Sequence, residues 1–523
     1  MTEHSETAQP LFFRWNWLYA PALAAIYPVL YTYADSVPDA NPRDATICGV
    51  VIVLAATALT CLLRLVYSSA KRASFAAVII IVWCFTFVGY LRVGRMAIEK
   101  LSKSSFNDYV LIIVWLMFLF ATLLLLLRVG WSEYRIGRIY RFVKLGCLFA
   151  IVFVLFQIAS SYWRTTPAAG VSDSMWESDL EAMPATWKPD PMVPRRDIYY
   201  LLYDRYASEQ ALRRFFDFDN SEFDSELEKR GFIVDRNAVT SYPMTSTSMA
   251  STLNMRYLGP RVKTNSDYFS AVQSNEVGKL LIQAGYKYHF FGNQYEGLRS
   301  SSIAQWNMKV SVMPSEFADS LVSMTPLRPL IGRQHKHKFT LGKCAAVAEL
   351  AKDPTLTVTY AHFLVPHPPY AFARDGSSQT EINRVTRPEK ELYIDQLVAT
   401  NRLILQTIDG ILSASAVKPI IILQADEGPY LMAGDESLTR DQQMAKRLGI
   451  LNAFFIPDEA IRQRLPKPLM PINTFRFLFK EYFGAPIELL PDRVFFWETP
   501  EPTGAAATGT RIIEVTQNVL TGK

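Results

Sequence analysis

Five uncharged, apolar stretches of similar length occupy the first third of this chain. They are Trp15–Tyr33, Ala45–Leu63, Ser74–Leu91, Tyr109–Leu127 and Leu145–Trp163. Each is close to the roughly 20 residues that a helix needs to cross about 30 Å of hydrocarbon. No comparable stretch follows Trp163. The sequence therefore predicts five transmembrane helices followed by a large water-soluble domain.

The basic residues around these stretches predict which ends face the cytoplasm, because Lys and Arg near helix ends are retained there. One side would carry Arg14, Lys71, Arg72, Arg128, Arg135, Arg138 and Arg141. The other would carry Arg43, Arg95, Lys100, Lys103 and Arg164. If the richer side is cytoplasmic, an odd number of crossings places everything after Trp163 outside the cytoplasm. We expect a multi-pass protein of the cell (inner or cytoplasmic) membrane with an extracytoplasmic C-terminal domain.

Charge and cysteine content narrow the function classes. A net charge of +5 over 523 residues is too small to imply nucleic acid binding, and lipid headgroups better explain the basic residues near the spans. Cys344 is the single cysteine after the spans, so no disulfide can form within the downstream domain. A channel or transporter is disfavoured because the ionisable candidates, such as Arg64 and Arg92, lie at span ends.

Changes in composition divide the chain into four segments. Residues 1–165 form the membrane domain, and residues 166–193 are interpreted as a linker because prolines collect there among small and acidic residues. Residues 194–497 form one folded domain that is large enough to bury a core without disulfides. Residues 498–523, which begin with many Pro, Gly, Ala and Thr residues, form a C-terminal tail.

Within residues 194–497, short apolar runs alternate with segments of helical spacing. The expected strands are Ile198–Tyr203, Phe232–Val234, Tyr286–Phe291, Leu356–Val365 and Pro419–Gln424. The expected helices are Glu209–Phe216, Glu222–Arg230, Asn275–Ala284 and Lys390–Ser413. Residues 334–338, Gln-His-Lys-His-Lys, are expected as an exposed basic loop. The alternation predicts an α/β fold with a mostly parallel sheet and helices on both faces.

Acidic residues follow two of the expected strands. Asp204 comes directly after the first strand, and Asp426, Glu427 and Gly428 follow the late strand Pro419–Gln424 after one alanine. Reactive groups of open α/β sheets collect at the carboxyl ends of strands. Carboxylates at neighbouring strand ends repel each other unless a cation lies between them, and their hard oxygens suit a divalent metal. Each acid alone is better explained as a turn or helix-cap residue, but the acids together favour a metal site.

A third segment, Ser-Tyr-Pro-Met-Thr-Ser-Thr-Ser-Met-Ala-Ser at residues 241–251, is rich in hydroxyl groups and leads into a helix-like run. Thr245 is placed near the expected helix start. Free backbone N–H groups and the positive end of the helix dipole would favour both a deprotonated hydroxyl and a phosphate there. Simple capping of the helix by Thr245, Ser246, Thr247 and Ser248 explains the same pattern, and both interpretations stay open.

A fourth segment holds two histidines, in Ala-His-Phe-Leu-Val-Pro-His-Pro-Pro-Tyr at residues 361–370. His367 is fixed between prolines just after a strand. An imidazole held there could bind a substrate oxygen, protonate a leaving group or bind a metal. His362 lies inside the strand and is expected to be a packed or hydrogen-bonded core residue.

Taken in order, these four segments resemble the sulfatase-like branch of the alkaline phosphatase superfamily. The resemblance runs from about Arg195 to Trp497 and includes residues 242–255 and 472–493 as well as the candidate site. Five spans before an extracytoplasmic domain are also similar to lipoteichoic acid synthases and lipid A phosphoethanolamine transferases.

The resemblance implies a role for each matched residue. It implies that Asp204, Thr245, Asp426 and Glu427 hold one divalent ion, that Thr245 is the catalytic nucleophile and that His367 binds substrate. One position departs from the family pattern, since its usual Asp-His-Gly is Asp426-Glu427-Gly428 here. Glu427 would replace an imidazole nitrogen with a hard oxygen, which favours manganese, magnesium or calcium over zinc.

The resemblance also implies a reaction. The Cys/Ser-x-Pro-x-Arg signature of true sulfatases does not occur around Thr245, and a Thr nucleophile suggests attack on phosphorus with a phosphothreonine intermediate. We expect a phosphotransferase that takes a phospho-headgroup from a membrane phospholipid and passes it to an envelope glycan or lipid. The alternatives are hydrolysis of a phosphoester or sulfoester, and a non-catalytic relative that binds an envelope polymer or a partner protein.

Overall fold

The computed structural model of the chain has two compact units. One comprises Met1–Pro167 with Met313–Gly332, and the other comprises Ala168–Val312 with Arg333–Lys523. The structure describes residues 16–35, 42–67, 69–102, 108–128, 132–165, 175–177, 183–184, 187–188, 195–259, 265–293, 296–308, 316–326, 333–379, 387–430, 437–498 and 512–515.

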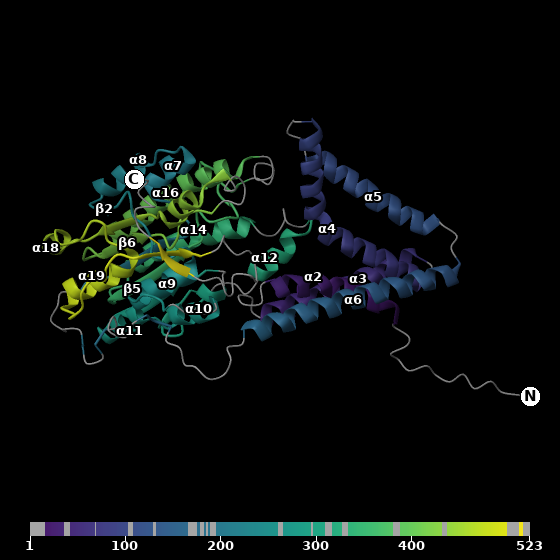
Figure 1. The fold of residues 1–523 in the computed structure, drawn as a ribbon, viewed down its shortest axis with the longest axis horizontal. Coiled ribbons are helices and arrows are strands. Elements are labelled where there is room, and N and C mark those ends of the chain that lie inside the picture. The colour runs from purple at the N-terminus through teal and green to yellow at the C-terminus, as the bar shows by residue number, and fades with distance from the viewer. Residues whose placement is uncertain are drawn as a thin grey trace, which may run out of the picture. The chain divides into compact units, whose positions relative to one another are not determined.

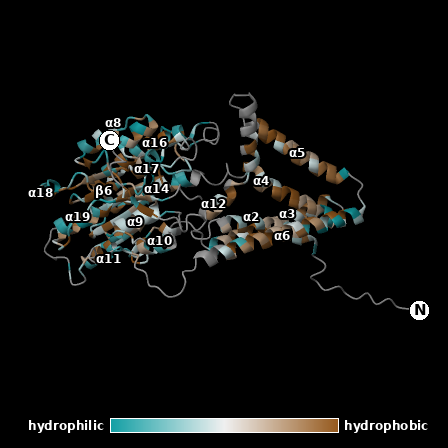
Figure 2. Ribbon diagram, viewed as in Figure 1, coloured by the Kyte–Doolittle hydropathy of each residue, from teal (hydrophilic) through white to brown (hydrophobic). Residues whose placement is uncertain are grey.

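The first unit is helical (Figure 1). Its elements are η1 (Asn16–Leu18), α2 (Tyr19–Asp35), α3 (Pro42–Val66), α4 (Ala70–Ser102), α5 (Asp108–Arg128), α6 (Glu133–Thr165) and α12 (Glu316–Ser323). Four of these helices are long and apolar enough to cross a membrane, over Pro42–Val66, Ala70–Leu91, Val110–Arg128 and Tyr134–Ser160. Figure 2 shows apolar residues along α5, where Met117, Phe118 and Phe120 are exposed as lipid-facing side chains would be.

The first predicted span, Trp15–Tyr33, corresponds to α2, which has 17 residues and contains Pro28. It is not among the four candidate spans, so the predicted count of five stays a prediction. The helix nevertheless packs against α3, α4 and α6. Its alanines Ala20, Ala24 and Ala25 are buried against residues of those helices.

The second unit is built on a seven-stranded sheet with the order β2-β7-β6-β1-β5-β3-β4. The central strands β6 (Ile420–Gln424), β1 (Ile198–Tyr203), β5 (Thr357–Phe363), β3 (Lys287–Phe291) and β4 (Trp306–Asn307) are parallel. The edge strands β7 (Asn452–Phe455) and β2 (Ile233–Val234) run antiparallel to their neighbours. A separate ribbon pairs β8 (Val494–Trp497) with β9 (Ile512–Val515). The predicted mostly parallel sheet is thus confirmed.

Helices cover both faces of this sheet, as predicted. Residues Tyr199, Leu201 and Tyr203 of β1 point into a core shared with α7 (Glu209–Phe216), α8 (Ser221–Lys229), α14 (Arg333–Leu350) and α16 (Glu389–Ala414). The alternate residues Ile198, Tyr200 and Leu202 point into a second core. That core is formed with α9 (Thr245–Asn254), α10 (Asn265–Gln273), α11 (Glu276–Gln283), α17 (Arg440–Leu448) and α19 (Pro471–Phe483). The short helices η3 (Glu296–Leu298) and α18 (Glu459–Arg462) complete the unit.

The predicted exposed loop at residues 334–338 is wrong, because these residues form the start of α14. Lys336 and Lys343 lie two turns apart on this helix and are 7% and 1% exposed. Apolar periodicity did not indicate a helix there because these inward-facing positions carry lysines, whose amines meet backbone carbonyl groups.

Parts of the predicted linker and tail pack on the second unit. Trp176 forms a β-bridge with Leu258, and the ring of Trp187 lies 5.8 Å from that of Phe479. Ile512–Val515, within the segment interpreted as a tail, forms β9. The other residues of these two segments lie largely outside the described part of the chain.

Candidate functional site

Three neighbouring parallel strands bring their carboxyl ends together. In the registers of β1 with β5 and β6, Leu202 lies beside both His362 and Gln424. Because side chains alternate between the faces of a strand, His362 and Gln424 share the face of Leu202. Asp204 and Asp426 lie two residues beyond Leu202 and Gln424, where the chain leaves the same edge of the sheet. That face is the one covered by α9, whose first residue is Thr245.

Asp204, His362 and Asp426 form a compact, buried group. Each offers one ligand atom, and these atoms all lie within 4.8 Å of one another. Nε2 of His362 is 3.7 Å from Oδ2 of Asp204, and no member of the group is more than 3% exposed. The structure therefore brings together the two acids that the sequence paired. It adds His362, which sequence analysis placed in the core without a functional role.

The two carboxylates destabilise each other's charged form. Burial raises the pKa of Asp204 well above its usual range, and the charges of Asp426 and Glu427 raise it further. Burial and Glu427 raise the pKa of Asp426 to about 7, while the nearby Thr245 hydroxyl opposes that rise. Two like charges held this close in a dry site favour a cation between them.

His362 has the protonation state that metal binding needs. Burial and the nearby Lys343 lower its pKa to about 3, so that the ring is neutral. Nε2 of His362 and Oδ1 of Asp204 are buried and have no hydrogen-bond partner among the described residues. Nδ1 of His362 lies 3.0 Å from the side-chain amide of Asn293. Binding through Nε2 requires a proton on Nδ1, for which this amide offers an acceptor when its oxygen faces the ring.

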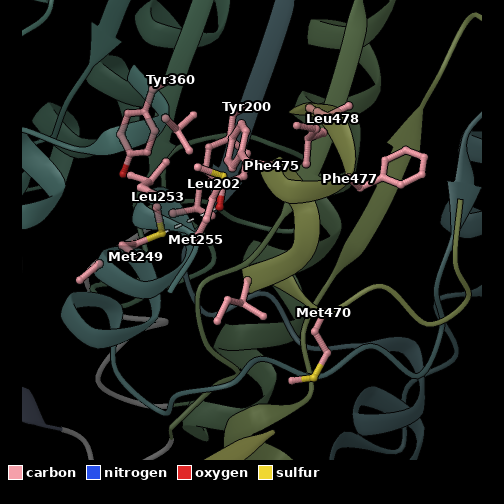
Figure 3. Packing of buried hydrophobic residues seen from close by; sticks show 14 of the residues in the cluster. Tyr200, Leu202, Met249, Leu253, Met255, Tyr360, Met470, Phe475, Phe477 and Leu478 are labelled. Atoms are coloured by element: carbon pink, nitrogen blue, oxygen red, sulfur yellow. Dashed lines mark hydrogen bonds between the residues drawn. The ribbon is translucent and has the colours of Figure 1, made fainter. Parts of the chain in front are cut away.

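Thr245 is positioned by the packing of α9 on the sheet. Met249 and Leu253 of this helix point into the core with Tyr200 and Leu202, as Figure 3 shows. Helix α9 thereby places its first residue beside the end of β6. The Thr245 hydroxyl lies near enough to the Asp426 carboxylate to lower the pKa of that acid.

The neighbouring hydroxyl groups have other partners. The N-cap residue of α9 is Met244, and no side chain caps the helix start. Thr247 donates to the carbonyl oxygen of Met244, and Ser248 lies 2.9 Å from the hydroxyl of Thr240. Thr245 lies near Asp426, and it does not have the capping role that sequence analysis left open.

Glu427 is adjacent to Asp426 in sequence but points to different partners. Its Oε1 lies 3.2 Å from Nε of Arg205, and its Oε2 lies 2.9 Å from Nη2 of Arg447. The turn that places it needs Gly428, because a Cβ at that position would come within 2.3 Å of the Lys446 carbonyl oxygen. Glu427 is outside the group formed by Asp204, His362 and Asp426, and its predicted role as a metal ligand stays a prediction.

His367 lies in a loop that is tied to the end of β1. Its backbone N–H donates to the carbonyl oxygen of Asp204 over 3.1 Å. Nδ1 contacts the carbonyl oxygen of Pro368, and since a carbonyl only accepts, Nδ1 carries the ring proton and Nε2 has a free lone pair. Burial, with the charges of Arg205 and Lys336, lowers the pKa of His367 well below its usual range. The ring is therefore neutral, and its predicted contact with substrate stays a prediction.

Two buried side chains hold this loop and the strand ends in place. Lys336 donates to the carbonyl oxygens of His367 and Pro369 at 2.6 and 3.0 Å. Lys343 donates to those of Gly292 and His362 at 2.5 and 2.7 Å. Neither lysine was recognised from the sequence. The signal that could have found them is the pair of lysines seven residues apart, which share one face of a helix.

The side chains present fit a divalent ion. Two carboxylates, an imidazole and a hydroxyl are an accepted donor set for zinc, and the oxygens also suit manganese. Each of the three close ligand groups is buried, and all three carry atoms that lack a hydrogen bond among the described residues. Such atoms are costly to bury unless they bind something.

The solved structures that match this chain are distant from it in sequence. The zinc complex of the C-terminal periplasmic domain of EptC from Escherichia coli is 14% identical, with a TM-score of 0.40, covering 58% of this chain and 87% of that one. The integral membrane lipooligosaccharide phosphoethanolamine transferase EptA from Neisseria meningitidis is 13% identical, with a TM-score of 0.34, covering 86% and 89%. A 2-O glycosaminoglycan sulfatase is 13% identical, with a TM-score of 0.36, covering 56% and 72%.

These structural neighbours are phosphoethanolamine transferases and sulfatases, which are enzymes of the alkaline phosphatase-like superfamily. They are of the kinds that the sequence motifs resemble. No protein family model matches the chain, and no curated protein matches it in sequence.

Proposed function

We propose that this chain is a membrane-anchored, metal-dependent phosphotransferase that moves a phospho-headgroup through a phosphothreonine at Thr245. The observation that carries the proposal is the meeting of Asp204, His362 and Asp426 with the Thr245 hydroxyl at one edge of the sheet. A nucleophile beside a buried ligand group is the arrangement that phosphoryl transfer through an enzyme-bound intermediate requires.

Asp204, Asp426 and His362 would hold the ion, with Thr245 next to it. When bound, a divalent ion would lower the pKa of the Thr245 hydroxyl and stabilise negative charge on the phosphoryl oxygens. The preference for manganese, magnesium or calcium was based on Glu427 as a ligand. With an imidazole nitrogen from His362 in its place, zinc fits as well as manganese does.

Thr245 carries the first half of the reaction. Its Oγ1 forms a bond to phosphorus while the bond from phosphorus to the lipid glycerol oxygen breaks. Oγ1 loses its proton and the glycerol oxygen gains one. The start of α9 holds Oγ1 beside Asp426 for this attack.

His367 serves the second half. A hydroxyl group of an envelope glycan or lipid attacks the phosphothreonine, the bond from phosphorus to Oγ1 breaks, and Oγ1 regains a proton. The lone pair on Nε2 of His367 can take the proton that the attacking hydroxyl loses. Water in place of the acceptor gives hydrolysis by the same steps.

A lipid donor fits a chain that crosses the membrane, and the packing of α2 supports the predicted five crossings. The start of α2 lies at Tyr140 of α6, whose hydroxyl donates to the carbonyl oxygen of Asn16 over 2.7 Å. Its end, at Val29 and Tyr33, packs near Ile158 of α6. Residues 140 to 158 of a helix rise about 27 Å. Helix α2 therefore runs parallel to α6 over nearly the thickness of the hydrocarbon layer.

The test uses full-length protein in lipid nanodiscs with phosphatidylethanolamine or phosphatidylglycerol labelled in the headgroup. We expect label on Thr245, detected by mass spectrometry after rapid quenching, and its loss in Thr245→Ala. The matched control is Thr247→Ala, which removes a hydroxyl of the same helix that bonds to the Met244 carbonyl. The control should label as the wild type does.

The fate of the label separates the alternatives. Label that moves on to a second molecule supports transfer. Label that appears in water alone supports a hydrolase. Wild-type protein that is never labelled, together with Thr245→Ala protein that keeps its cellular phenotype, would favour a non-catalytic binding protein and overturn the proposal.

A further inference from the structure

Glu427 joins two arginines that come from distant parts of the chain. Arg205 is the second residue after β1, and Arg447 lies in the last turn of α17. Both ion pairs with Glu427 are at or below 3.2 Å, and the side chains of Glu427 and Arg447 are 3% and 8% exposed. Partners this well buried have lost most of their contact with water, so the arrangement is not a chance surface contact.

The Arg205–Glu427–Arg447 cluster is next to Thr245. Nε of Arg447 donates to the carbonyl oxygen of Pro243 over 2.8 Å, two residues before the nucleophile. Arg205 is the residue after Asp204. Both arginines are also close enough to His367 for their charges to lower its pKa. The cluster therefore borders the nucleophile, the ligand group and the loop of His367.

The charges of the cluster do not cancel. Two guanidinium groups face one carboxylate, which leaves one positive charge. A divalent ion between Asp204 and Asp426 would offset those two acids. Lys336, whose charge acts on both Asp204 and His367, adds another positive charge. The completed site would attract an anion rather than repel it.

The conformation of Arg205 indicates that its direction matters. Its φ of 60° lies in the left-handed region, which is strained for a residue other than glycine. The Tyr393 hydroxyl holds it there by donating to the Arg205 carbonyl oxygen over 2.9 Å. Nη2 of Arg205 donates to no acceptor in the described part of the chain. A strained backbone thus aims a guanidinium group that keeps a donor available.

We propose that Arg205 and Arg447, held in place by Glu427, form the subsite for the non-bridging oxygens of the phosphoryl group that Thr245 attacks. The inference rests on the proposed function and adds its substrate-recognition residues. The planar fork of arginine matches two oxygens of a phosphoryl group better than a lysine can. Glu427 is then a positioning residue that stands where the resembled family has a metal ligand. The substrate class is an anionic phosphoester, and a sulfate ester offers the same tetrahedral oxygens.

Binding of inorganic phosphate and of sulfate to full-length protein in detergent micelles tests this subsite. Titration calorimetry at saturating Mn²⁺ would compare the wild type with Arg205→Met, Arg205→Lys and Arg447→Met. We expect each methionine variant to bind phosphate at least about 10-fold more weakly, since a charge-assisted hydrogen bond is lost. Arg205→Lys, which keeps the charge but loses the fork, should fall between. Sulfate binding as tight as phosphate binding would assign the subsite to sulfate esters as well.

Arg440→Met is the matched control, because Arg440 begins the same helix and bonds to the Trp497 carbonyl instead. It should bind phosphate as the wild type does. Mn²⁺ affinity reports on folding of every variant and should be unchanged or higher when an arginine is removed, since a repelling charge is lost. Wild-type phosphate affinity in both Arg205→Met and Arg447→Met would overturn the inference.

The same titration in Thr245→Ala protein separates this inference from the proposed reaction. That variant has no nucleophile, yet the arginines should still give it measurable phosphate binding that Arg205→Met abolishes or weakens. Retained, arginine-dependent phosphate binding with no phosphothreonine in the wild type would refute the reaction and keep the subsite. A labelled Thr245 together with phosphate binding that does not depend on the arginines would support the reaction and refute the subsite.

Discussion

Two groups of buried charged side chains lie at the same edge of the sheet and differ in how they are satisfied. On the α14 side, Lys336 and Lys343 each donate to two backbone carbonyl oxygens. On the α9 side, Asp204 and His362 carry buried atoms without a partner among the described residues. The carboxylates there have raised pKa values because burial and like charges oppose ionisation.

The difference separates scaffold from binding site. Burying a polar group costs several kcal/mol unless hydrogen bonds or an opposite charge offset the loss of water. The lysines meet that requirement within the protein, so their role is to fix the ends of β3 and β5 and the loop of His367. The Asp204, His362 and Asp426 group meets it only with something from outside, which is the argument for a metal.

The largest effect is expected from removing an imidazole of the unsatisfied group. His362→Gln should weaken binding of Zn²⁺ or Mn²⁺ by more than about 100-fold, because the loss of a ligand exceeds the 10- to 100-fold cost of losing a ligand's hydrogen-bond partner. Competition with a chromophoric chelator, on full-length protein in detergent, measures this. His289→Gln is the control, since His289 is a buried histidine on the adjacent strand β3. Equal metal affinity in both variants would remove His362 from the site.

The other half of the comparison predicts a pH effect. Burial lowers the pKa of Lys343 to about 7. Between that value and its unfolded pKa of about 10.4, the unfolded chain binds more protons, so the wild type gains stability as pH rises. Relative to Lys343→Met, we expect a gain of up to about 2 kcal/mol between pH 7 and 8.5. Chemical unfolding followed by near-ultraviolet circular dichroism measures it.

Lys338→Met, which changes an exposed lysine of the same helix, should show no such pH-dependent difference from the wild type. Parallel stability curves for the wild type and Lys343→Met across this pH range would mean that the amine stays protonated throughout. The hydrogen bonds to Gly292 and His362 would then outweigh burial.

A smaller effect is expected from the residue that orients His362. Asn293→Ala removes the amide beside Nδ1, and it should weaken metal binding by about 10-fold, within the range known for such partners. The same chelator competition applies. Asn307→Ala removes a half-buried amide of β4 that bonds to Ser301 instead, and it should leave metal affinity unchanged. An effect of Asn293→Ala as large as that of His362→Gln would mean that Asn293 itself binds the ion.

Much of the fold could be predicted because its signals are local. The strand Ile198–Tyr203 and the helix Glu209–Phe216 have the bounds expected from their apolar pattern. Helix α14 was missed because Lys336 and Lys343 occupy its buried face, and their partners are backbone carbonyls that no pattern of side chains reveals. Helix α14 therefore depends on long-range hydrogen bonds from its lysines, which the local sequence does not show.

The candidate site also contains residues that local sequence predicts and residues that it does not. Asp204 and Asp426 follow apolar strands, and strand order alone brings them together. His362 was interpreted as a core residue, and it is buried with a hydrogen bond as expected, but its distance from Asp204 depends on the register of β5 with β1. The surroundings of Glu427 depend on Arg447, which is near in space through the contact of Gly428 with the end of α17. The local sequence predicts neither the distance from His362 to Asp204 nor the contact of Glu427 with Arg447.

The smallest effect is expected at Glu427, which the family resemblance made a ligand and the ion pairs make a positioning residue. Glu427→Gln should weaken metal binding by less than about 10-fold, because only a charge outside the coordination sphere is lost. A true ligand would instead match the loss in His362→Gln. Glu427→Asp, whose shorter side chain keeps the charge, should keep metal affinity and weaken phosphate binding. Calorimetry with Mn²⁺ and then with phosphate separates the two roles in one series.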